Sequence, residues 1–215
     1  MTESEKIRVL LVDDHAVVRA GYRVLLKNCD DIEVVCEAES GERASRAFVE
    51  SEPDVVVMDL SMPGLGGLEA IRRITARDDK ARILVFSMHE DTVFVEQALQ
   101  AGAQGYITKN SAPEVLIEAI RELASGKTHI DSDILQRLAI QKSRGRNSPL
   151  STLSTREFEI FCLLAEGLNT SEIAKRMSLS YKTVANYSTQ IKSKLNVTSV
   201  AELARLAIRH NIINP

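Results

Sequence analysis

Five side chains that can do acid, hydroxyl or amine chemistry stand at the ends of apolar runs in the first half of this 215-residue chain. Asp13 and Asp14 follow "IRVLLV", Asp59 follows "VVVM", Ser87 ends "ILVFS", and Lys109 follows "GYIT". Neighbouring carboxylates repel unless a cation neutralises them, and hard oxygen ligands favour Mg²⁺ or Ca²⁺. A hydroxyl and an ammonium group suit the oxygens of a phosphoryl group. Together these residues predict phosphate chemistry assisted by a divalent cation.

Each of these residues alone has a simpler explanation. An Asp after a strand is more often a turn or helix cap, and an isolated Lys is usually solvated. Four of the five apolar runs end in such a residue, and along the chain these are an acid, an acid, a hydroxyl and an amine. Capping alone does not explain this pattern. An aspartate can itself attack phosphorus and become an aspartyl phosphate. Asp59 is our candidate nucleophile because it is central in this order, beside the open loop formed by Pro63, Gly64, Gly66 and Gly67.

The apolar runs are the elements that must position these side chains. Five β-branched runs lie at 7–14, 32–39, 54–60, 82–88 and 105–109. Between them lie helical patterns, and the first helical stripe comprises Val17, Val18, Tyr22, Leu25 and Leu26. Strands that are apolar on both faces and alternate with helices predict an α/β fold with a doubly wound, five-stranded parallel sheet. Right-handed crossovers bring the carboxyl ends of all five strands to one edge, where ligands bind.

The second half of the chain predicts a small all-α domain. Residues 131–152 combine a short amphipathic pattern with a polar linker at 143–152, so we expect domains at 1–130 and 153–215. Helix starts are marked by a capping residue three positions before a Glu. The predicted helices lie at 155–166, 170–177, 181–195 and 199–209.

The middle two of these helices have the spacing of a helix-turn-helix. The connecting "SLS" at 178–180 has the length of its turn, and such a unit lays its second helix in the DNA major groove. We expect base or backbone contacts from the polar side of that helix and its start, at Ser180, Lys182, Thr183, Asn186, Tyr187, Thr189, Gln190, Lys192 and Lys194. The alternative from composition alone is a helical protein-interaction domain whose polar face is solvated.

Charge separates the two halves. Residues 1–130 carry a net charge of −8 and residues 131–215 carry +5, which gives the whole chain −3. The acidic half suits a cation, whereas the basic half suits a polyanion such as DNA. No apolar run reaches the roughly 18 residues of a membrane span, and the polar start is unlike a signal peptide. We therefore expect a cytoplasmic protein with no membrane partner.

The motifs of the first half resemble a known family. "VLLVDDH", "VVVMDLSMPGLGG", "VFS" and "GYITK" are similar to the receiver domain of bacterial two-component response regulators, over about residues 6–126. The resemblance implies that Asp59 takes phosphate from a sensor histidine kinase. It further implies Mg²⁺ at Asp13, Asp14, Asp59 and the backbone carbonyl of Ser61, phosphoryl contacts from Ser87 and Lys109, and a rotamer switch at Tyr106.

The second half resembles the LuxR-type helix-turn-helix. With the receiver, the chain is similar to the full-length NarL/FixJ-type response regulators. "KTV" followed by Tyr187 and the ending "LAIRHNIIN" resemble the GacA/UvrY branch of that family. Ala185 stands where many members carry a basic residue, and Tyr187 where many carry His. These departures affect the expected base contacts.

The expected function is therefore a phosphorylation-switched transcription regulator that binds double-stranded DNA. We expect it to dimerise when phosphorylated, with RNA polymerase as a further partner. One alternative is an adaptor, or a regulator that does not respond to phosphate. Another is an aspartyl-phosphate phosphatase or phosphotransferase, but Ser61 stands where hydrolases of that type carry a second acid. We therefore expect no enzyme.

Overall fold

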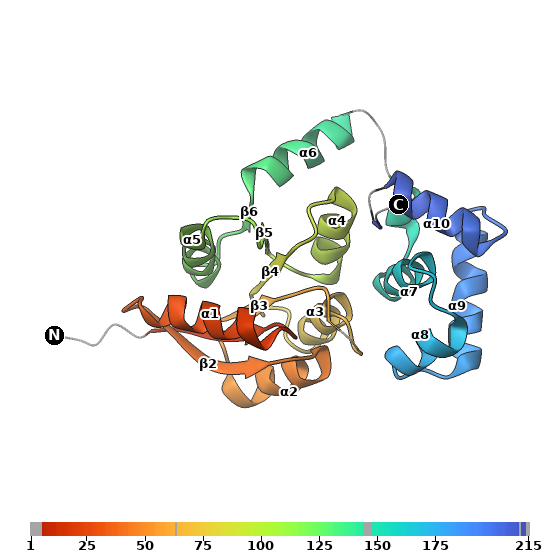
Figure 1. Cartoon of the computed structure of the whole chain (residues 1–215). Helices are drawn as coiled ribbons and strands as arrows, with labels where there is room; N and C mark the ends of the chain where they lie inside the picture. Colours follow the sequence, from red (N-terminus) through yellow and green to blue (C-terminus); the bar gives the residue numbers. More distant parts are fainter. Residues whose placement is uncertain (1–5, 63, 144–147, 211, 214–215) are drawn as a thin grey trace. The chain divides into compact units, whose positions relative to one another are not determined.

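The computed structural model describes residues 6–62, 64–143, 148–210 and 212–213. The chain divides into two compact units, one of residues 1–90 and 98–132, the other of residues 91–97 and 133–215 (Figure 1). Pro63 of the predicted loop and residues 144–147 of the predicted linker lie outside the described residues. No helix in the described ranges has both the length and the apolar character that crossing a bilayer requires.

The first unit is built on a parallel sheet. Its strands are β1 (Ile7–Val12), β2 (Ile32–Ala38), β3 (Val55–Met58), β4 (Ile83–Ser87), β5 (Gly105–Thr108) and β6 (His129–Ile130). They lie in the order β2-β1-β3-β4-β5-β6, and every neighbouring pair is parallel. The predicted doubly wound parallel sheet is confirmed, and its five predicted strands are joined by a sixth, β6. β6 was not predicted, because two residues are too few to show a periodic pattern.

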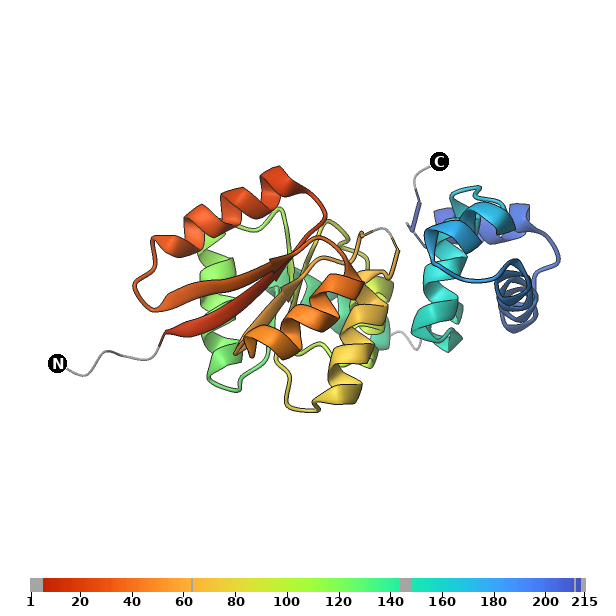
Figure 2. The ribbon, with the colours of Figure 1, turned by 90° about the horizontal axis from the view of Figure 1, so that it is seen from below.

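Helices cover both faces of this sheet, as Figure 2 shows from below. They are α1 (Ala16–Lys27), α2 (Gly41–Ser51), α3 (Gly67–Arg77), α4 (Thr92–Ala101) and α5 (Pro113–Ala124). α1 and α5 bury their apolar sides in one core with alternate residues of the strands. The expected stripe of α1 is wrong at Val17, which is 86% exposed. Val17 lies nine residues, or two and a half turns, from the buried Leu26 and so faces the opposite way.

The second unit is helical, as predicted. It contains α6 (Ser132–Ser143), a short 3₁₀ turn η1 (Pro149–Thr152), α7 (Thr155–Ala165), α8 (Thr170–Arg176), α9 (Tyr181–Lys194) and α10 (Val200–Arg209). The last four begin and end within one residue of the predicted bounds. Phe158, Phe161, Ile173, Ile191 and Leu203 are fully buried and form its core. Capping boxes start α7 at Ser154 and α8 at Asn169, which confirms two of the three predicted starts in full. At the third, Ser199 accepts from the amide of Glu202, but the Glu202 carboxylate accepts from the amide of Thr198.

Glu157 is the buried carboxylate of the first capping box. Its Oε2 accepts hydrogen bonds from the Ser154 amide at 2.8 Å and from Lys194 Nζ at 2.6 Å. Burial raises the pKa of Glu157, but the hydrogen bonds from Lys194 and Ser154 outweigh it and leave the pKa below its ordinary value. The ionised form therefore stabilises the fold, and this contribution is lost as the pH falls through the lowered pKa.

We expect Glu157→Gln to destabilise the unit that contains α7 by about 1–2 kcal/mol at pH 7, because a capping carboxylate and an ion pair are both lost. The difference should shrink below about pH 4, where the wild-type carboxyl group is itself protonated in the unfolded chain and begins to protonate in the folded one. Calorimetric unfolding of both proteins at pH 7 and pH 3.5 measures this. A difference of equal size at both pH values would contradict the role of the ionised carboxylate.

Candidate functional site

The structure brings the first-half candidates together at the carboxyl edge of the sheet. Lys109 Nζ donates to Asp13 Oδ2 at 2.7 Å and to Asp59 Oδ2 at 2.8 Å. β1 and β3 are neighbours, and the Asp59 amide still donates to Val12 O, so the two acids leave adjacent strands side by side. The Lys109 amide donates to Ser87 O, which places the ends of β4 and β5 beside each other in the same way. The site lies where the order of the strands reverses, as expected for a doubly wound sheet.

The charges in this pocket are strongly coupled. Asp13 and Asp59 are almost fully buried, at 3% and 2% exposed. Burial lowers the pKa of Lys109, but the hydrogen bonds and charges of Asp13 and Asp59 outweigh it and raise the pKa above its ordinary value. Lys109 therefore stays protonated and offsets part of the carboxylate charge. One ammonium group facing two buried carboxylates leaves the pocket with excess negative charge, which a divalent cation can balance.

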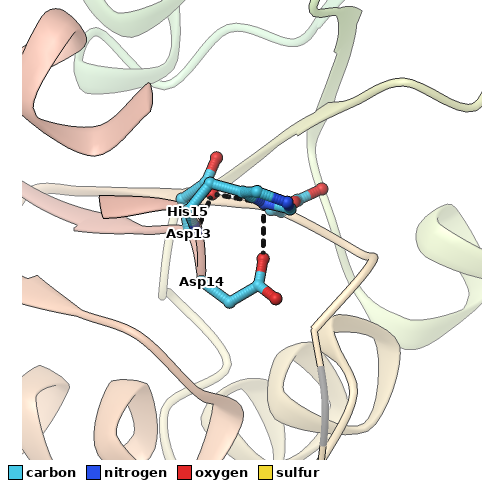
Figure 3. Close-up of side chains that lie close together, drawn as sticks. Asp13, Asp14 and His15 are labelled. Carbon is cyan, nitrogen blue, oxygen red and sulfur yellow. Dashed lines mark hydrogen bonds and ion pairs between the residues drawn. The ribbon is translucent and has the colours of Figure 1, made fainter. Parts of the chain in front are cut away.

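The remaining carboxylate oxygens form a set of donors suited to a hard cation. Asp14 Oδ1 is buried and accepts no hydrogen bond from the residues that the structure describes, while His15 Nδ1 lies 2.8 Å from it. Asp13 Oδ1 accepts from the His15 amide and lies 3.4 Å from His15 Nδ1 (Figure 3). Together with Asp59, these residues offer ligand atoms that all lie within 4.8 Å of one another. An acidic cluster of this kind, with a buried oxygen that no hydrogen bond satisfies, is typical of a magnesium site.

Ser87 and Tyr106 are joined by a residue that the sequence did not indicate, His89. Both Ser87 and Tyr106 are fully buried. His89 donates its amide to Ser87 Oγ at 3.3 Å and accepts at its carbonyl from the Tyr106 hydroxyl at 2.7 Å. His89 Nε2 lies 2.9 Å from Ser61 Oγ, and burial lowers the pKa of its imidazole. His89 thus links the loop after β3, the end of β4 and Tyr106 of β5, although it belongs to no motif quoted above.

The loop after Lys109 is fixed by Asp131, a second residue that sequence reasoning missed. Asp131 Oδ2 accepts from the Thr108 amide at 3.2 Å and from Ser111 Oγ at 2.6 Å. The Asp131 amide donates in turn to Tyr106 O, next to the short pairing of β5 with β6. These contacts fix the chain both before Lys109, at Thr108, and after it, at Ser111. They join residues about 20 positions apart, a relation that a single sequence does not reveal.

The second-half candidates lie on and just before α9. Val184 and Ile191 are buried, whereas Lys182, Asn186, Thr189 and Gln190 are exposed. Thr183, Tyr187 and Lys192 are half-buried, and Ser180 and Lys194 are exposed. Ser180 caps α9 by accepting from the Thr183 amide at 3.0 Å, and Lys194 pairs with Glu157 as described above. α8 and α9 are joined through residues 177–180, with Leu179 half-buried, in the arrangement of a helix-turn-helix.

Comparison with known proteins identifies the class to which this fold and site belong. Residues 9–121 match the family model described as "Response regulator receiver domain", and residues 151–207 match "Bacterial regulatory proteins, luxR family". The chain therefore belongs to the two-component response regulators that carry a LuxR-type DNA-binding domain. These are transcription regulators rather than enzymes.

Individual relatives cover nearly the whole chain. Response regulator UvrY of Escherichia coli strain K12 is 42% identical over 97% of this chain and 96% of its own length. Response regulator GacA of Pseudomonas aeruginosa is 38% identical over 97% of this chain and 98% of its own. Among solved structures, RcsB from Salmonella enterica serovar Typhimurium, bound to promoter rprA in the presence of phosphomimetic BeF₃⁻, shares 26% identity at a TM-score of 0.71, over 94% of this chain and 98% of that chain. The resemblance to the GacA/UvrY branch is confirmed.

Proposed function

We propose that Asp59 accepts a phosphoryl group from the phosphohistidine of a sensor kinase and that this modification controls DNA binding by α9. The bridge from Lys109 Nζ to Asp13 and Asp59 is the observation that carries this proposal, because it places a protonated amine and two acids at one reactive point. An oxygen of Asp59 attacks phosphorus as the P–N bond to the kinase histidine breaks, so an aspartyl phosphate forms and the histidine is released. Lys109 and the Ser87 hydroxyl are proposed to contact the new phosphoryl oxygens.

The cation of this site is proposed to be Mg²⁺. Asp13, Asp14 and Asp59 would hold it together with the backbone carbonyl of Ser61. Mg²⁺ supplies positive charge that offsets the charge on the phosphoryl group during transfer. The chemistry of the donor set supports this choice, since all of these ligands are hard oxygens.

Tyr106 and the loop after Lys109 are the proposed route from the pocket to the rest of the receiver. A phosphoryl group would draw in the Ser87 hydroxyl and Lys109, and the Tyr106 hydroxyl, now bonded to His89 O, would change its rotamer. The output is proposed to be DNA binding as a homodimer, because one short helical module makes few phosphate contacts. RNA polymerase is a proposed further partner. The cytoplasm is the proposed location, because the DNA target lies there.

DNA binding by the full chain tests the output. Duplexes are first selected from a random pool by protein treated with acetyl phosphate and Mg²⁺, and affinity for the selected duplex is then measured. We expect the phosphoryl donor to tighten binding by about 10-fold through a coupling between the two sites.

Two substitutions on α9 test the contacts with DNA. Lys182→Ala should weaken binding to all sequences and reduce the slope of log affinity against log salt concentration by about one. Gln190→Ala should instead relax the preference for the selected sequence.

Two results would contradict this output. Equal affinity with and without the donor would indicate a regulator that ignores phosphate. Failure to retain any duplex at low salt would indicate a protein-binding adaptor instead.

A further inference from the structure

His15 places an imidazole nitrogen among the carboxylates of the pocket, and the function proposed above gives it no role. We propose that His15 Nδ1 is an additional ligand of the divalent-cation site, so that this site favours a first-row transition-metal ion over Mg²⁺ more than its carboxylates alone would. The inference rests on the proposed function, because it concerns the same cation site. It adds a nitrogen ligand and a metal preference to that site.

The spacing of the donor atoms supports coordination by one ion. His15 Nδ1 lies 2.8 Å from Asp14 Oδ1 and 3.4 Å from Asp13 Oδ1 (Figure 3). Two ligands at right angles on an octahedral ion with bonds of about 2.1 Å are about 3.0 Å apart. The two observed separations lie on either side of that value. His15 Nδ1 can therefore be the neighbour of either oxygen on the same ion.

The three atoms can also accept a metal. Asp13 Oδ1 accepts from the His15 amide at 2.7 Å, and its second lone pair is left for an ion. Lys109 occupies the other oxygens, Oδ2 of Asp13 and Oδ2 of Asp59. Asp14 Oδ1 is buried and accepts no hydrogen bond within the described residues. His15 Nδ1 lies 2.8 Å from this oxygen with no hydrogen bond between the two atoms, and a cation bound to both would supply the missing partner.

The contacts of the His15 side chain within the described residues give it no role in stabilising the fold. It is the residue that precedes α1, but its side chain makes no capping hydrogen bond, and it is 66% exposed. The hydrogen bond to Asp13 Oδ1 comes from the backbone amide and does not depend on the side chain. Replacing the imidazole should therefore leave the fold intact.

Ligand chemistry predicts the direction of the preference. Oxygen ligands suit Mg²⁺, whereas imidazole suits the later first-row ions, whose affinity for nitrogen ligands rises from Mn²⁺ through Co²⁺ to Cu²⁺. Adding one imidazole to a carboxylate site should thus favour Co²⁺ and change Mg²⁺ binding little. Co²⁺ is a suitable probe because it is paramagnetic and shifts the proton resonances of a coordinated ring.

The test compares the untagged full chain with His15→Gln by calorimetric titration with Co²⁺ alone and with Mg²⁺ alone. We expect the substitution to weaken Co²⁺ binding by about 10-fold and to leave Mg²⁺ binding within about 2-fold. The Co²⁺-loaded wild type should show a shifted, exchangeable imidazole proton in its NMR spectrum, and His15→Gln should lack it. His89→Gln is the matched control, and it should keep this resonance.

Three results would overturn the assignment. The first is an equal loss of affinity for both ions, and the second is tighter binding of both ions by His15→Gln, as expected if a charged imidazole merely competes with the metal. The third is a shifted ring proton that survives in His15→Gln but disappears in His89→Gln. These outcomes differ from failure of the proposed function, in which the wild type would bind neither Mg²⁺ nor Co²⁺.

Discussion

Asp59→Asn is expected to fold normally and to lose phosphoryl uptake from acetyl phosphate and Mg²⁺ by about 100-fold or more. The carboxamide keeps the size of the side chain and an oxygen that can still accept from Lys109 Nζ, but it is not a nucleophile toward phosphorus. Stability should not fall, because one of two buried carboxylates that share a single ammonium group is removed. Intact-mass measurement over time gives the uptake, and circular dichroism checks the fold.

Asp79→Asn provides the matched control for this loss. Asp79 is an exposed acid of the same unit that lies outside the pocket, so its amide variant should take up phosphate at the wild-type rate. Equal labelling of Asp59→Asn and wild type would refute the assignment of the phosphoacceptor.

Gly67→Ala is expected to destabilise the receiver by about 3 kcal/mol and to abolish phosphoryl uptake. A Cβ at Gly67 would lie 2.1 Å from the carbonyl oxygen of Asp59 and 2.7 Å from Leu60 Cα. These are backbone atoms, which cannot move aside as the end of a flexible side chain can. The Gly67 amide also donates to Leu60 O, so a shift at Gly67 moves the chain that carries the phosphoacceptor. Urea unfolding and acetyl phosphate labelling measure the two effects.

Gly21→Ala is the control for this substitution. Gly21 lies within α1, and nothing is within 4 Å of its added Cβ, so the variant should gain about 0.5–1 kcal/mol from the better helix propensity of alanine. If Gly67→Ala were as stable as the wild type, the close packing of α3 against the Asp59 backbone would not be needed.

The sequence predicted the strands and the pocket for a physical reason. Both faces of the first unit's sheet are buried, so β1, β3, β4 and β5 appear as apolar runs, and the residue that ends each run must reach the same edge. The order of acid, acid, hydroxyl and amine therefore predicted a spatial cluster, and the bridge from Lys109 to Asp13 and Asp59 shows that cluster. The last four helices of the second unit were located to within a residue, and Ser154 and Asn169 mark the starts of α7 and α8 with local contacts.

The features that were missed depend on tertiary contacts. His89 reaches Ser61 across 28 positions, and Asp131 reaches Ser111 across 20, so neither contact has a periodic signature. β6 is defined only by its pairing with β5. The error at Val17 has a different cause, because its spacing of nine residues from Leu26 already places it on the opposite side of α1. Even a strong family resemblance leaves such contacts unspecified.

The most direct test of the central claim is to locate the phosphoryl group in the full chain after treatment with acetyl phosphate and Mg²⁺. Borohydride reduces an aspartyl phosphate to homoserine, which peptide mass spectrometry places in the sequence. The proposed function predicts reduction at position 59 alone, because Asp59 is the proposed nucleophile, whereas Asp13 and Asp14 are proposed only to hold the cation. Reduction at Asp13 or Asp14 instead, or a labelled protein with no reduced aspartate, would contradict the account.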